Sequence, residues 1–343
     1  ASSELPALQR ARLDYVFEAA ARVRRSWPFT TPDDTCILLI EATVQWTVHC
    51  ALAPQGFVPA AGSFRGHPIF HHAGGSFASA GQARSTAELL AESPAAAHVP
   101  LADSAQPTLP GSTPWLVLGS LEALAAFHPA FPEATTEAWV SVAIHELIHT
   151  HQLRAPGFAP TLAAIQDRSR DPSALTRLFG QDLRYHALVE REYALLTHAA
   201  ERAPDDRRSA LQALRAWRGL YAKRARHLSK RADGARLLED DALFSYLEGT
   251  ARFAESAFLD DAAQHPERTK ADDPRFHDYA LFVGRGYAGS PNRQLDEAYF
   301  YAIGYHLCVL LERLDPSWKL RVHSARRYLL ELAEQVAASA DRP

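Results

Sequence analysis

Residues 135–152 read TTEAWVSVAIHELIHTHQ, and the character of the chain changes at this stretch. Before it, short apolar runs rich in Ile, Val and Trp alternate with Gly- and Pro-rich segments, as is typical of strands and loops. After it, apolar residues recur at helical spacing in almost every segment. The sequence therefore predicts an α+β fold. A mixed α/β lobe with short strands covers residues 1–134, a mostly helical lobe covers residues 135–343, and the quoted helix stands where they meet.

Periodicity and turn residues place the expected elements along both lobes. Residues 36–49 are expected to form one strand, or two strands broken near residues 41 and 42. Further strands are expected in short runs over 53–82 and at 115–118. Helices of the first lobe are expected at 5–25 and at 121–128, the latter capped by Ser120. Helices of the second lobe are expected at 135–153, 174–200, 208–229, 237–260, 295–313 and 316–338. The Ala-, Ser- and Pro-rich segment 85–110 is predicted as a loop.

The composition is that of a globular protein of ordinary charge. The 343 residues are 47% hydrophobic and 22% charged, which excludes a disordered chain and a disulfide-dense mini-protein. At about 150 residues per domain, this length predicts roughly two lobes. The 36 basic and 40 acidic residues leave a net charge of −4, so no nucleic-acid partner is expected. No run of about 18 apolar residues is present, so no membrane span is expected.

The quoted stretch contains the pattern H-E-x-x-H. His145 and His149 are four residues apart, so in a helix they project from one face and can bind a single ion. Imidazole nitrogen is a favoured ligand of Zn²⁺. Glu146 lies about 100° further round the helix, where its carboxylate can reach a water molecule beside the ion and act as a general base. The pattern predicts a Zn²⁺ site with Glu146 as a catalytic residue.

A catalytic zinc site takes a third protein ligand, which identifies its class. The metzincin pattern requires Gly and His at the positions that Gln152 and Ala155 occupy, so that class is excluded. The spacing usual in thermolysin-like enzymes falls near Ser169, which cannot serve. The remaining candidates are glutamates on later helices: Glu248, and Glu190 or Glu192, which a shorter gap favours.

Residues 248–253 read EGTARF. Glycine in a helix interior costs about 1 kcal/mol relative to alanine, and a close approach of another helix at Gly249 would offset that cost. H-E-x-x-H followed at long distance by E-G-x-A-x-[FY] resembles the gluzincin metallopeptidases, in particular the peptidase MA-like group. The resemblance covers these two motifs and not the whole chain. It implies that Glu248 is the third zinc ligand, and it places Phe253 where the family more often has tyrosine.

The gap between His149 and Glu248 is long for that family and implies an insertion. Residues 174–236 are predicted to form a helical hairpin that turns near residues 203–206. Its second arm has an apolar stripe and many basic residues: Arg207, Arg208, Arg215, Arg218, Lys223, Arg224, Arg226, Lys230 and Arg231. These basic residues form either a surface for an acidic substrate or partner, or an ordinary solvated helix face.

Zinc peptidases usually supply a side chain that stabilises the oxyanion of the tetrahedral intermediate. The segment 295–306 holds three closely spaced candidates: Tyr301, Tyr305 and His306. Tyr301 and Tyr305 are four residues apart and share a helix face, although aromatic core packing would give the same pattern. Zinc-bound histidines usually donate their second nitrogen to a carboxylate or carbonyl group, and Glu255 or Asp296 can accept such a hydrogen bond.

The start of the chain and its three cysteines bear on location. The sequence begins at Ala1, which fits a protein cut after a signal peptide and equally a cytosolic protein that has lost its first methionine. Cys36 and Cys50 can pair only if the segment between them folds back on itself. Cys308 lies in an apolar run and is predicted as a buried thiol. We expect an extracytoplasmic protein, either periplasmic or secreted.

These residues predict a zinc-dependent hydrolase that cleaves peptide or other amide bonds, with a peptide or protein as its substrate. Two alternatives explain the same residues differently. A non-haem iron oxygenase would bind iron through the two histidines and one carboxylate. An inactive metal-binding relative would instead bind a partner through the basic hairpin.

Overall fold

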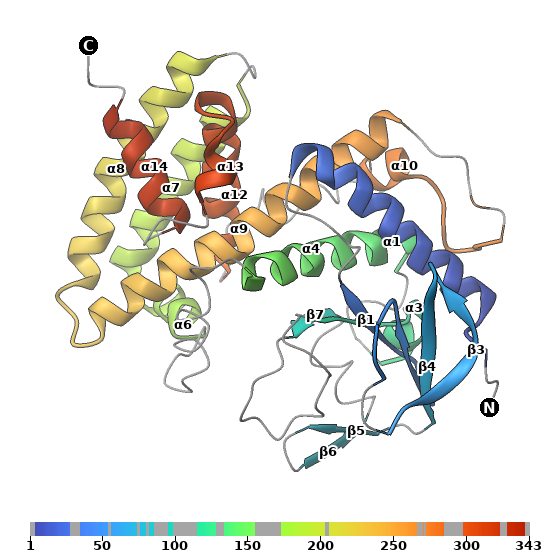
Figure 1. Ribbon diagram of the computed structural model, residues 1–343. Helices are drawn as coiled ribbons and strands as arrows, with labels where there is room; N and C mark the ends of the chain where they lie inside the picture. Colours follow the sequence, from blue (N-terminus) through green and yellow to red (C-terminus); the bar gives the residue numbers. More distant parts are fainter. Residues whose placement is uncertain are drawn as a thin grey trace. The chain divides into compact units, whose positions relative to one another are not determined.

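Figure 1 shows the computed structural model of the chain. The structure describes residues 4–27, 35–53, 56–73, 76–79, 82–85, 95–98, 115–127, 134–154, 173–202, 206–265, 270, 272–284, 298–322 and 328–339. Two compact units divide the chain: the first comprises Ala1–Arg154 and Ala257–Arg285, and the second comprises Ala155–Ser256 and Gly286–Pro343.

The first unit is built on a six-stranded mixed sheet with the strand order β3-β4-β2-β1-β8-β7. Its strands are β1 (Cys36–Ile40), β2 (Val44–Val48), β3 (Val58–Phe64), β4 (His67–Ala73), β7 (Ala95–His98) and β8 (Trp115–Gly119). β1 and β8 are parallel, and the other pairs are antiparallel. β5 (Ser76–Ser79) and β6 (Gln82–Ser85) form a separate hairpin. Every residue of β1 is buried because the strand is central and apolar throughout.

The β1–β2 hairpin brings two cysteines together. Ile37 pairs with Val48, which leaves Cys36 and Cys50 at the open end of the hairpin with their Cα atoms 4.7 Å apart. They form a disulfide, while Cys308 is a buried free thiol. Of the two alternatives for residues 36–49, two strands with a break near residues 41 and 42 are confirmed, and the turn at this break makes the pairing possible.

Strand β7 lies inside the segment that the sequence predicts as a loop, and that prediction is wrong there. The strand reads AAAH and has no alternating pattern that would reveal it. It is held by antiparallel pairing with β8, from Ala95 opposite Leu118 to His98 opposite Trp115. β7 is therefore a strand because it pairs with the main chain of β8, about 20 residues further along, and not because of its own side chains.

The described helices of the first unit are α1 (Ala7–Ser26), α3 (Leu121–Phe127), α4 (Thr136–Arg154), α10 (Tyr279–Gly284) and the end of α9. α1 packs against α4, and α4 also contacts β7 and β8 (Figure 1). The predicted helix starts are confirmed. Ser120 accepts a hydrogen bond from the N–H of Ala123 at 3.2 Å, and Thr135 accepts one from the N–H of Ala138 at 3.3 Å.

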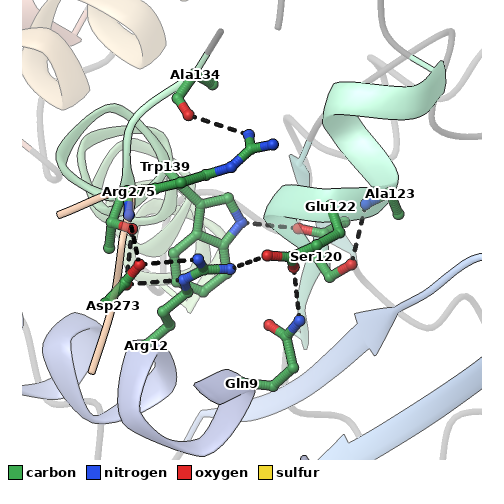
Figure 2. A network of polar contacts seen from close by, with 11 residues as sticks. Gln9, Arg12, Ser120, Glu122, Ala123, Ala134, Trp139, Asp273 and Arg275 are labelled. Carbon is green, nitrogen blue, oxygen red and sulfur yellow. Dashed lines mark hydrogen bonds and ion pairs between the residues drawn. The ribbon is translucent and has the colours of Figure 1, made fainter. Parts of the chain in front are cut away.

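An ion-pair network with a buried centre joins α1, α3 and α4, and Figure 2 shows it from close by. The guanidinium of Arg12 donates two hydrogen bonds of 2.9 Å to Asp273 and one of 2.6 Å to Glu122. Asp273 also accepts a hydrogen bond of 2.8 Å from the hydroxyl of Thr136, the first residue of α4. Because Arg12 and Asp273 are both fully buried, the start of α4 is anchored by a desolvated pair.

The second unit is helical in its described residues. It contains α6 (Ser173–Gln181), α7 (Leu183–Ala200), α8 (Arg207–Leu228), most of α9 (Gly234–Gln264), α12 (Tyr299–Leu314), α13 (Trp318–Arg321) and α14 (Tyr328–Ser339). α7 and α8 pack together as the predicted hairpin, and α12 packs against α7, α8 and α14. The predicted helix 174–200 divides at Asp182, which caps α7 by accepting from the N–H groups of Arg184 and Tyr185.

The core of the second unit contains a fully buried arginine. Arg224 of α8 forms ion pairs with Glu192 of α7 at 2.7 Å and with Asp241 of α9 at 2.6 Å. Tyr299 of α12 donates a hydrogen bond of 2.7 Å to the same Asp241 carboxylate. The sequence groups Arg224 with the basic residues of a solvated or partner-binding face, and for this residue that prediction is wrong. Its burial is possible because two carboxylates compensate its charge.

The units divide the chain differently from the predicted lobes, although the α+β class is confirmed. α4 belongs to the first unit, and residues 257–285 return to that unit through Phe258, which packs edge-to-face on Tyr279, and through Asp273. Within the described residues, no helix combines the length and the apolar character that crossing a membrane requires.

Candidate metal centre

The helix that carries the two motif histidines is fixed at its start. The indole N–H of Trp139 donates to the carbonyl of Gly119 at 2.7 Å, which ties α4 to the end of β8. Glu137 accepts hydrogen bonds from the N–H groups of His277 and Asp278, at 2.5 and 2.6 Å. These contacts fix the direction in which the following turns of α4 present their side chains.

His145 and His149 point their Nε2 atoms at the same place. The two atoms are 3.2 Å apart, and the rings are nearly perpendicular, with an interplanar angle of 83°. If each nitrogen lies about 2.05 Å from a shared ion, a separation of 3.2 Å corresponds to an angle of about 100° at the ion, close to tetrahedral. His145 is only 7% exposed, and His149 is half-buried. The predicted spacing therefore gives a pair with the geometry of zinc ligands.

Gln152 orients His149. The Nδ1–H of His149 donates to the side-chain carbonyl oxygen of Gln152 at 2.6 Å, which leaves the lone pair of Nε2 for an ion. The sequence suggests Glu255 or Asp296 for this role. Glu255 pairs with Arg252 at 2.7 Å, and Asp296 lies outside the described residues. Gln152 could have been found from its position three residues after His149, which places both on one helix face.

A carboxylate completes the group. One ligand atom each of His145, His149 and Glu248 lies within 4.8 Å of the others, and Glu248 is half-buried on α9. In the part of the chain that the structure describes, this is the one such group of three or more His, Cys, Asp or Glu side chains. The structure therefore brings together the three residues that the sequence analysis selects as metal ligands.

The other two candidates for the third ligand are engaged elsewhere. Both carboxylate oxygens of Glu192 accept hydrogen bonds, from Arg224 at 2.7 and 3.1 Å and from Trp217 at 3.1 Å. Glu190 lies 3.3 Å from His186 on the surface of α7. Neither glutamate belongs to the group that contains the two histidines.

Glu146 is not one of the three grouped side chains. It follows His145 on α4 and is half-buried. A turn of about 100° per residue directs it away from the line that joins the two imidazoles. A carboxylate beside a metal site and partly open to solvent can accept a proton from water.

Two glycines let α9 and α12 touch beside Glu248. A Cβ atom on Gly249 would lie 2.4 Å from the Cα of Gly304, and one on Gly304 would lie 2.2 Å from the carbonyl oxygen of Ser245. No side chain other than hydrogen fits at either position. The close helix approach expected at Gly249 is confirmed, and α12 is the helix that makes it.

The oxyanion candidates lie on α12 around this crossing. The guanidinium carbon of Arg252 lies 5.7 Å from the centre of the Tyr301 ring, and the N atom of Tyr305 is 3.0 Å from where a Cβ on Gly249 would be. Both tyrosines are half-buried. His306 is only 4% exposed, donates from Nδ1 to the carbonyl of Ala302 at 2.7 Å, and has a pKa that burial lowers to about 4. It is a neutral interior residue.

Comparison of the chain with protein-family models, with curated proteins and with solved structures gave no match.

Proposed function

We propose that this protein is a zinc-dependent hydrolase that cleaves peptide or other amide bonds. The observation that carries the proposal is the grouping of His145, His149 and Glu248. Two imidazoles and one carboxylate are a recurring ligand set of catalytic zinc sites, which keep a fourth position open. The likeness of residues 145–149 and 248–253 to the gluzincin motifs supports the same class of enzyme.

The residues present fit zinc better than a hard cation such as Mg²⁺ or Ca²⁺. Two of the three ligand atoms are imidazole nitrogens, whereas those cations prefer oxygen ligands in larger number. The hydrogen bond from His149 to Gln152 fixes the tautomer that zinc requires. When bound by these residues, zinc would polarise the carbonyl group of the substrate and lower the pKa of a water molecule.

The chain itself would supply the proton transfers and the oxyanion contact. Glu146 accepts a proton from the attacking water and passes it to the leaving amine. Tyr301 and Tyr305 are the candidates to donate a hydrogen bond to the oxyanion, because both are half-buried tyrosines of α12, the helix that crosses α9 next to Glu248. We do not assign His306 to this role because it is buried and bonded to its own helix.

We further infer that the protein works outside the cytoplasm, in the periplasm or as a secreted protein. The Cys36–Cys50 disulfide supports this inference, since such bonds persist in oxidising compartments. Alkylating the denatured protein, taken directly from its natural source, tests it. One labelled cysteine per chain is expected, and three labelled cysteines would argue for a reducing compartment.

Metal analysis of the purified protein by mass spectrometry tests the metal site. We expect about one zinc per chain in the wild type and in Glu146→Gln, and loss of zinc in His149→Ala. His198→Ala is the matched control, because His198 is an exposed histidine of α7 outside the metal group. Iron in place of zinc would favour an oxygenase. Absence of metal after incubation with zinc would reject the proposal and favour a partner-binding role.

Cleavage of a peptide library tests the chemistry separately. Glu146→Gln keeps the size of the side chain and removes its basicity, so cleavage should collapse while zinc remains bound. Glu190→Gln changes an exposed glutamate of α7 in the same way and should leave cleavage unchanged. Equal activity of wild type and Glu146→Gln would remove Glu146 from the mechanism.

A further inference from the structure

The second unit contains a hollow of about 640 Å³ at the end of the helical hairpin. It is lined by the end of α6, the start of α7, the connection between α8 and α9, and the first turn of α9. Its volume lies within the range of sites that bind small molecules, which is about 300–1,000 Å³. Nothing in the proposed hydrolase reaction uses it.

The lining of this hollow is rich in arginine. The six charged residues that line it are Arg177, Arg184, Arg231, Arg236, Asp182 and Asp233. The four arginines come from four different segments, so their convergence is a property of the fold and not of a basic run in the sequence. Four positive and two negative groups leave a net charge of +2 on the wall.

Both aspartates are occupied by contacts within the chain. Asp182 caps α7, and its second oxygen lies 2.7 Å from Nε2 of His227. Burial would raise the pKa of Asp182, but the hydrogen bonds from Tyr185 and His227 outweigh it and hold the pKa below its ordinary value. Asp233 accepts a hydrogen bond of 3.1 Å from Arg231. Both carboxylates therefore already accept hydrogen bonds from within the chain.

The uncharged part of the wall consists of Gln181 and of apolar side chains, among them Leu178, Leu183 and Leu237. Leu183, the first residue of α7, is 86% exposed and offers apolar surface at the hollow. A ligand that combines an anionic group with an organic part would meet both kinds of surface.

We propose that this hollow binds a soluble small molecule that carries a phosphate group. Guanidinium groups match phosphate oxygens with paired hydrogen bonds, and several of them suit a multiply charged group better than a single carboxylate. The site does not depend on the hydrolase proposal. Leu237 precedes Glu248 by eleven residues, which separates the two by about 16 Å along α9.

Calorimetric titration of the full-length protein with inorganic pyrophosphate tests this site. We expect saturable binding with one site per chain at about 0.1 M salt. Leu183→Asp should weaken it at least about tenfold, because it adds a negative charge to the hollow. The same aspartate is favourable at a helix start, so folding is not compromised. Arg177→Ala combined with Arg184→Ala removes two exposed cations and should act similarly.

Two controls exclude other sites. Arg218→Ala removes an exposed arginine of α8 outside the lining and should change the affinity less than about twofold. His149→Ala should still bind pyrophosphate. Loss of binding in this variant would mean that pyrophosphate binds at the metal centre. No saturable binding in the wild type, or an equal loss in Arg218→Ala, would overturn the proposal. In sedimentation with phosphatidic acid vesicles, we expect no binding of the protein to the vesicles. If the protein does bind them and Leu183→Asp abolishes that binding, the ligand would be a lipid headgroup and not a soluble molecule.

Discussion

Gly304 on α12 occupies the space that a side chain on Gly249 of α9 would need. The Cα of Gly304 is 2.4 Å from the position of a Cβ atom on Gly249, and its carbonyl carbon is 2.6 Å away. Both near atoms belong to the backbone, so a rotamer change cannot relieve the contact. The crossing of α9 and α12 therefore requires glycine beside Glu248.

Replacing Gly249 with alanine should destabilise the protein. Alanine favours a helix interior by about 1 kcal/mol over glycine, but here the two helices would have to separate. Overpacking of this kind typically costs about 1–3 kcal/mol, so the net change in the free energy of unfolding should be unfavourable. Denaturation by urea, followed by circular dichroism, measures it.

Gly219→Ala is the matched control for that experiment. Gly219 lies in the interior of α8, is exposed, and has no atom within 4 Å of a Cβ position. Alanine there should stabilise the protein by about 0.5–1 kcal/mol. If the two substitutions change the free energy of unfolding in opposite directions, the loss in Gly249→Ala is due to the helix contact. Changes in the same direction would contradict this explanation.

Removing Gln152 should weaken zinc binding. The Gln152 carbonyl holds the Nδ1–H of His149 at 2.6 Å, and loss of such an outer contact typically lowers metal affinity about 10–100-fold. We expect that loss in Gln152→Ala, measured by competition with a chelator. Gln152→Glu also offers an acceptor oxygen and should retain the affinity. Gln212→Ala, on the exposed face of α8, is the control for a change of the same kind elsewhere.

Arg12→Ala should be among the most destabilising single substitutions. It would leave the Asp273 carboxylate buried without its main partner, and breaking a buried pair costs about 3–5 kcal/mol. Arg231→Ala breaks an ion pair with Asp233 whose side chains are 43% and 40% exposed, and it should cost less than about 1 kcal/mol. Comparable losses in the two variants would mean that the Arg12 network (Figure 2) contributes no more than a surface pair.

Local patterns predicted the parts of the site that lie on one element. His145 and His149 share a helix face because of a spacing of four residues. The hairpin that joins Cys36 to Cys50 was one of two alternatives that the sequence left open for residues 36–49. The helix starts at Ser120 and Thr135 are also local, since each hydroxyl binds an N–H three residues later. Such features depend on neighbours in the sequence and are readable from it.

Features that depend on distant partners were not predictable. Arg12 binds Asp273 across 261 residues, and no local pattern marks either one as buried. Arg224 belongs to a basic helix without acidic residues, and only its contacts with Glu192 and Asp241 make its burial possible. The gluzincin-like motif pointed to Glu248, but spacing alone left Glu192 open, and only the structure shows that Arg224 and Trp217 engage Glu192 in the core.

The stability of the protein should fall as the pH drops from 6.5 towards 4. Burial lowers the pKa of His306 from 6.5 to about 4, so the unfolded chain binds a proton in this range that the folded chain does not. The stabilising effect is fully present above pH 6.5 and is lost as the pH falls to about 4. It amounts to at most about 3.5 kcal/mol, at about 1.4 kcal/mol per pH unit over about 2.5 units. Urea denaturation at several pH values should show this slope in the wild type and in His198→Gln, whose histidine is exposed.

His306→Phe removes the titrating group while keeping a ring against Tyr193 and should flatten the slope. An unchanged slope in His306→Phe would assign the pH dependence to other groups.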